Sequence, residues 1–130
     1  MTGKTLTCLL IDDDEDDHDI FKFALSEIDK EIICLTANNC YEGLQKLREA
    51  KAALPDYIFL DLNMPGMNGK ECLMQIKNIP ALQSIPVIIF STSSVQADIT
   101  QAKNLGAFDF ISKPPSISGL VNLLRTIIKY

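Results

Sequence analysis

The chain has 130 residues, of which 47% are hydrophobic, and a formal net charge of −5 at pH 7. This length fits one domain with a single core, and the excess of acids argues against nucleic acid as a direct ligand. No apolar stretch approaches the roughly 20 residues of a membrane span, and no signal peptide pattern is present. We therefore expect one cytoplasmic domain over residues 1–130, with no output domain and no membrane contact.

Five short apolar runs alternate with helical patterns along the chain. The runs cover residues 6–11, 32–36, 57–60, 87–90 and 108–111. Between and after them, apolar side chains recur at helical spacing. These sets are Ile20, Ala24 and Ile28; Leu44, Leu47 and Ala50; Cys72, Leu73 and Ile76; Val95, Ile99 and Ala102; and Leu120, Leu123, Leu124, Ile127 and Ile128. Because the runs are nearly all apolar, we expect strands buried on both faces of a five-stranded parallel sheet. The predicted fold class is doubly wound α/β.

Acidic residues follow the first predicted strand and the third. Asp12 and Asp13 begin an acidic run directly after the first strand, and Asp61 follows the third, ahead of a turn with Pro65 and Gly66. Ligands of open α/β sheets bind at the carboxyl ends of the strands, so these acids are expected at one edge. Like charges this close need a cation among them, and carboxylate oxygens are hard ligands that suit Mg²⁺. A magnesium site is predicted.

A hydroxyl and an ammonium group follow the last two apolar runs. Ser91 ends the fourth run, and Lys113 follows the fifth, directly before Pro114. A carboxylate can attack phosphorus to give an aspartyl phosphate, and catalysis then consists mainly of positioning and charge neutralisation. Acids, hydroxyl and ammonium on one edge therefore favour phosphoryl chemistry.

With these motifs in place, residues 5–128 resemble a receiver domain of the two-component response-regulator family, of the stand-alone single-domain type. The resemblance implies a flavodoxin-like (βα)5 fold with strand order 2-1-3-4-5, and it implies a role for each matching residue. The phosphoacceptor is Asp61; the metal ligands are Asp12, Asp13, Asp61 and the backbone carbonyl of Asn63; the switch residues are Ser91 and Phe110; and the lysine of the Lys-Pro motif is Lys113. Asp13 is the preferred direct ligand, and the peptide bond before Pro114 is commonly cis in this family.

The resemblance also implies a function. The chain would take a phosphoryl group from the phosphohistidine of a sensor histidine kinase or histidine phosphotransfer protein onto Asp61, with Mg²⁺. Phosphorylation would then change a surface formed by residues 95–105, 108–111 and 116–130, which would bind a downstream protein. The chain would not be an enzyme on other substrates, because it would catalyse only its own aspartyl phosphorylation and dephosphorylation.

Three residues depart from the family pattern. Thr92 stands where a small residue is usual, which narrows access to the phosphate, and Pro115 replaces an apolar or aromatic residue. Asp14 extends the acidic pair to a triple, so a one-residue shift of the acid roles stays open. Two other functions also stay open: a haloacid-dehalogenase-like phosphatase that uses Asp12 and Asp14, and a receiver-like binding module that works without phosphate.

Other polar residues carry no predicted role. Asp16, Asp17 and Asp19 are expected to be part of a solvated face or charges at a helix N-terminus that the helix dipole favours. His18 has no partner at ligand spacing and is expected to be solvated. The four cysteines, Cys8, Cys34, Cys40 and Cys72, form no CxxC pair, so buried reduced thiols are expected.

Overall fold

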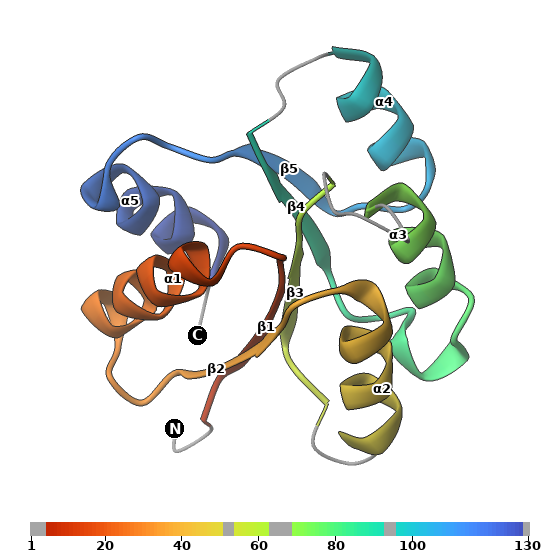
Figure 1. The fold of residues 1–130 in the computed structure, drawn as a ribbon, viewed down its shortest axis with the longest axis horizontal. Helices are drawn as coiled ribbons and strands as arrows, with labels where there is room; N and C mark the ends of the chain where they lie inside the picture. Colours follow the sequence, from red (N-terminus) through yellow and green to blue (C-terminus); the bar gives the residue numbers. More distant parts are fainter. Residues whose placement is uncertain (1–4, 51–53, 63–68, 93–95, 129–130) are drawn as a thin grey trace.

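The structure, a computed structural model, describes residues 5–50, 54–62, 69–92 and 96–128. Five parallel strands form one sheet in the order β2-β1-β3-β4-β5 (Figure 1), which confirms the predicted order. The strands are β1 (Thr7–Ile11), β2 (Ile33–Ala37), β3 (Tyr57–Leu60), β4 (Val87–Ser91) and β5 (Asp109–Ser112). The helices are α1 (Glu15–Ile28), α2 (Cys40–Ala50), α3 (Gly69–Lys77), the short 3-10 helix η2 (Pro80–Leu82), α4 (Gln96–Asn104) and α5 (Ile117–Ile127).

Helices cover both faces of the sheet, which confirms the doubly wound α/β class. Helices α1 and α5 lie on one face, and α2, α3 and α4 lie on the other (Figure 1). Along β1, Cys8 and Leu10 belong to the core under α1 and α5, whereas Leu9 and Ile11 belong to the core under α2 to α4. Alternate side chains thus enter two different cores, and this is why the strand is apolar at every position.

An aromatic group fills the core beneath α1. The ring of Phe21 contacts Phe59 of β3 edge-on at a centroid distance of 4.8 Å, and it lies 5.6 Å from Phe90 of β4. The helix face predicted from Ile20, Ala24 and Ile28 was partly wrong, because Ile20 is 40% exposed. The buried residues of α1 are His18, Phe21, Ala24 and Leu25.

Burial on both faces does not extend to the edge strand β2. In β2, Ile33 and Leu35 are 47% and 36% exposed, so the prediction of complete burial was wrong for this strand. The reason is its place in the sheet, since β2 is an edge strand and has a neighbouring strand, β1, on one side. The prediction was also wrong at the other edge of the sheet, where Phe108 is 66% exposed and Ile111 is the one buried residue of β5. The predicted helix residue Val95 lies outside the described residues.

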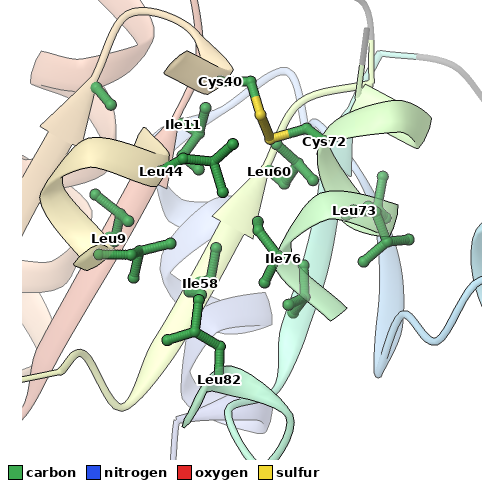
Figure 2. Close-up of a cluster of buried hydrophobic side chains, with 14 of the residues drawn as sticks. Leu9, Ile11, Cys40, Leu44, Ile58, Leu60, Cys72, Leu73, Ile76 and Leu82 are labelled. Atoms are coloured by element: carbon green, nitrogen blue, oxygen red, sulfur yellow. A yellow bond between two sulfur atoms is a disulfide. The ribbon is translucent and has the colours of Figure 1, made fainter. Parts of the chain in front are cut away.

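A disulfide joins the two helices α2 and α3. Cys40, the first residue of α2, is bonded to Cys72 of α3 across a Cα–Cα distance of 5.7 Å (Figure 2). The prediction of four reduced thiols was therefore wrong for this pair, while Cys8 and Cys34 are free. Bridging depends on how closely two Cα atoms approach in the fold, and a separation of 32 residues in sequence does not reveal that distance.

Within the part of the chain that the structure describes, no helix combines the length and the apolar character needed to cross a membrane.

Candidate functional site

The sheet itself places the site residues at its carboxyl edge. Backbone hydrogen bonds continue the strand ladders by one residue beyond three strands. The Asp12 N–H donates to the Ala37 carbonyl at 3.0 Å, and the Asp61 N–H donates to the Ile11 carbonyl at 3.0 Å. The Lys113 N–H donates to the Ser91 carbonyl at 2.7 Å. Two acids and a lysine from distant parts of the sequence therefore share one edge.

Three carboxylates gather at this edge. Asp12 and Asp61 are buried, with exposed fractions of 0% and 5%, and Asp13 is exposed. Each of the three offers one carboxylate oxygen, and these atoms lie within 4.8 Å of one another. Such a set of hard oxygen donors, open to solvent at Asp13, fits a divalent cation. The fourth predicted ligand, Asn63, lies outside the described residues.

The third acid of the run, Asp14, has a different position. It is the N-cap of α1, and its carboxylate accepts a hydrogen bond from the Asp16 N–H at 2.9 Å. Its own N–H donates to the Asp12 carboxylate at 2.9 Å. Asp14 thus caps the N-terminus of α1, and the acids that cluster with Asp61 are Asp12 and Asp13.

Lys113 lies among three carboxylates. Its Nζ is 2.6 Å from Asp17, 2.9 Å from Asp12 and 3.3 Å from Asp61. It also lies 5.2 Å from the centroid of the Phe90 ring. Burial alone would lower the pKa of the Lys113 ammonium, but hydrogen bonds to Asp17 and Asp12 raise that pKa above its ordinary value. Asp17 lies in the first turn of α1, which confirms the prediction of a charge at a helix N-terminus, but its ion pair with Lys113 shows that it is not simply a solvated charge.

The buried Asp12 carboxyl is difficult to ionise. Burial, and to a smaller extent the charge of Asp61, raise its pKa from an ordinary 3.8 to about 6, against the lowering effect of Lys113 and of the hydrogen bond from the Asp14 N–H. A cation beside Asp12 would favour the charged form. The electrostatics of the cluster therefore agree with its donor atoms in fitting a metal.

His18 is a site residue that the sequence prediction missed. It is 7% exposed, and its Nε2 lies 2.7 Å from the backbone oxygen of Asp12. Because a carbonyl only accepts, Nε2 carries the proton and donates it. The prediction of a solvated His18 was wrong, although one signal was available: Phe21 and Leu25 follow it at i+3 and i+7, which places all three on one helical stripe.

The two predicted switch residues lie on neighbouring strands. Ser91 is fully buried as the last residue of β4. Phe110 is half-buried on β5 and packs against the core under α2 to α4.

The described residues contain no cis peptide bond. The cis form that the resemblance implied for the Lys113-Pro114 peptide is therefore not found, in keeping with the intrinsic preference for trans.

Gly69 allows α3 to start close to the chain that follows β3. Its N–H donates to the Leu62 carbonyl at 3.0 Å. A Cβ at this position would lie only 2.4 Å from the Asp61 backbone oxygen and from the Leu62 Cα. Because both contacts are with backbone, no side-chain rotation relieves them, and glycine is required here.

Comparisons with known proteins agree with this geometry. The crystal structure of the phosphorylated cyanobacterial phytochrome response regulator RcpA is similar to this chain, with a TM-score of 0.86 and 31% sequence identity over 95% of this chain and 91% of that one. The Mn²⁺-bound form of response regulator Rcp1 is 25% identical, with a TM-score of 0.81, over 94% of this chain and 91% of that one.

Similar sequences include larger proteins. A protein-glutamate methylesterase/protein-glutamine glutaminase of Bacillus licheniformis is 48% identical over 81 residues, which is 61% of this chain. The chain spans between 21% and 35% of the length of the curated methylesterases that it matches. The family model of the response regulator receiver domain matches residues 8–125. The chain therefore belongs to the response regulator receiver family.

Proposed function

We propose that Asp61 is the phosphoacceptor of this receiver and that it takes its phosphoryl group from a phosphohistidine. The observation that carries this proposal is the place of the Asp61 carboxylate, at the end of β3, close to the Asp12 and Asp13 carboxylates and 3.3 Å from the Lys113 ammonium. Negative charge that develops on a transferring phosphoryl group would meet a lysine on one side and a cation site on the other.

The chemistry requires a nucleophile and charge neutralisation. An Asp61 carboxylate oxygen forms a bond to phosphorus as the P–N bond to histidine breaks, and the ring nitrogen keeps the electron pair. Lys113 neutralises charge on the phosphoryl oxygens, and Ser91, the last residue of β4, is placed to offer them a hydroxyl donor. Hydrolysis of the aspartyl phosphate would return the carboxylate. We propose no reaction of the chain on any other substrate.

Asp12, Asp13 and Asp61 would hold a divalent cation, for which we propose Mg²⁺, with the Asn63 carbonyl as a further ligand. The support is the set of carboxylate oxygens within 4.8 Å of one another and the raised pKa of Asp12. When bound, the cation neutralises charge on the phosphoryl group and on the acids. Asp13 is the preferred direct ligand because it is the exposed member of the set.

The partners proposed for this switch are proteins. A sensor histidine kinase or histidine phosphotransfer protein would supply the phosphoryl group, and a downstream protein would bind the surface of α4, β5 and α5. Phe108, directly before β5, is 66% exposed and would supply an apolar contact.

A direct nucleic-acid ligand is not proposed. The cytoplasmic location and the single-domain organisation without an output domain stay predictions.

The test is intact-protein mass after incubation with acetyl phosphate, with and without Mg²⁺, for the wild type and Asp61→Asn. We expect a gain of one hydroxylamine-labile phosphoryl group that requires the metal and is lost in the variant. Full labelling of Asp61→Asn would overturn the proposal. Free phosphate without an adduct, dependent on Asp12, would favour the phosphatase, although Asp14 is occupied as a helix cap. Neither product would favour a phosphate-independent binding module.

A further inference from the structure

The charge nearest to Lys113 is not one of the three acids of the cation cluster. Asp17, in the first turn of α1, lies 2.6 Å from Nζ, whereas the phosphoacceptor Asp61 lies 3.3 Å away. The Asp17 side chain is 25% exposed and that of Lys113 is 12% exposed, so this ion pair is partly withdrawn from solvent. Charge pairs in such surroundings are screened less by water and salt than pairs on an open surface.

The geometry points to Asp17 as a positioning residue that holds the Lys113 ammonium toward α1 and so slows phosphoryl transfer to Asp61. This inference rests on the proposed function and adds a residue to it. An ammonium group has three N–H donors, and here three carboxylates surround it. A phosphoryl group on Asp61 needs Lys113, and it must draw the ammonium away from Asp17.

The Asp17 charge acts through the lysine, because the carboxylate retains the ammonium beside α1. An asparagine at this position keeps the shape and a carbonyl oxygen but removes the charge. Lys113 would then be free to move toward Asp61, where it neutralises the incoming phosphoryl group.

Asp16 offers a matched control on the same helical turn. It carries the same charge, and its side chain is exposed. Its backbone N–H donates a hydrogen bond to the Asp14 cap. Among the described contacts, its carboxylate makes no hydrogen bond to Lys113 or to the acids of the site. Asp16→Asn therefore changes the net charge of the protein by the same amount without touching Lys113. A general charge effect moves both variants equally, whereas the proposed effect moves only Asp17→Asn.

The kinetic test measures the rate at which acetyl phosphate labels the protein in Mg²⁺. As the Asp61 oxygen bonds to phosphorus, the P–O bond to acetate breaks and acetate leaves with the electron pair. We expect Asp17→Asn to be labelled three- to tenfold faster than the wild type, Asp16→Asn within twofold of it, and Asp17→Glu close to it. In a Lys113→Met background, Asp17→Asn should change the residual rate less than twofold, because the proposed effect acts through the lysine. A merely structural role of Asp17 would change the rate by the same factor in both backgrounds.

A second measurement separates this inference from the proposed function. In metal-free urea unfolding, Asp17→Asn should lower the midpoint in the wild-type background and leave it unchanged in the Lys113→Met background. Equal shifts in both backgrounds, or equal labelling rates for Asp17→Asn and Asp16→Asn, would overturn the role of Asp17. If the unfolding coupling is present but the wild type takes no phosphoryl group, the ion pair exists and the kinetic role falls together with the proposed function.

Discussion

The two helical layers contribute to the site in different ways. Helix α1 brings charge and hydrogen bonds directly to it, through Asp17 on Lys113 and His18 on the Asp12 backbone. On the other face of the sheet lie α2 and α3, which are joined by the disulfide of Cys40 with Cys72. The α1 layer therefore sets the electrostatics of the site, whereas the α2–α3 layer packs against β3.

Removing the central aromatic ring of the α1 layer should have the largest effect. Phe21 is fully buried between Phe59 and Phe90, so Phe21→Ala should lower the free energy of unfolding by about 3–5 kcal/mol. Phe23, two residues further along the helix, is 51% exposed, and Phe23→Ala should change it by less than about 0.5 kcal/mol. Urea unfolding measures both, and similar losses in the two variants would contradict the described orientation of α1.

The opposite layer can be tested through its disulfide. For a bridge that spans 32 residues, loop closure predicts that reduction lowers the free energy of unfolding by about 3–4 kcal/mol. Urea unfolding with and without a reductant measures this difference, and the double variant of Cys40→Ser and Cys72→Ser should not respond. A thiol titration of the unfolded, unreduced protein should find two thiols, Cys8 and Cys34; four reactive thiols would contradict the bridge.

The pH dependence of stability tests the electrostatics of the α1 side. The Asp12 pKa is about 6 in the folded protein against an ordinary 3.8, so the folded state holds this proton more tightly than the unfolded chain. The contribution of Asp12 to the free energy of unfolding is therefore largest at low pH. It falls by about 3 kcal/mol in total as the pH rises from the lower to the higher of these two values. The metal-free wild type should show this decline relative to Asp12→Asn, and Mg²⁺ should reduce it. Parallel pH profiles of the two proteins would refute the assignment.

The smallest predicted effect concerns His18. His18→Phe removes the donor to the Asp12 carbonyl and should lower the free energy of unfolding by about 1 kcal/mol, with weaker Mn²⁺ binding measured by electron paramagnetic resonance. His18→Gln keeps an N–H donor and should recover part of the Mn²⁺ affinity. If Phe and Gln give the same affinity as the wild type, the hydrogen bond does not position the acidic pair.

The strand ends explain why much of the site could be predicted from the sequence. Asp12 and Asp61 each follow an apolar run directly, and Lys113 follows one after a single serine. Parallel strands bring their carboxyl ends to one edge, so the order of residues was enough to predict that these side chains lie together. Asp17 and His18 depend on how α1 is rotated about its axis, and Cys40 and Cys72 depend on how closely two helices approach. Those quantities come from side-chain packing between distant segments, which local patterns do not record. The incomplete burial of β2 likewise follows from the strand order and not from its composition.

The most direct test of the account is to locate the phosphoryl group. The protein is labelled with acetyl phosphate and Mg²⁺, treated with borohydride to convert an aspartyl phosphate to homoserine, digested and sequenced by mass spectrometry. The account predicts homoserine at position 61 alone, and none when the metal is removed. Homoserine at position 12, 13 or 17, or none in fully labelled protein, would contradict the role of Asp61.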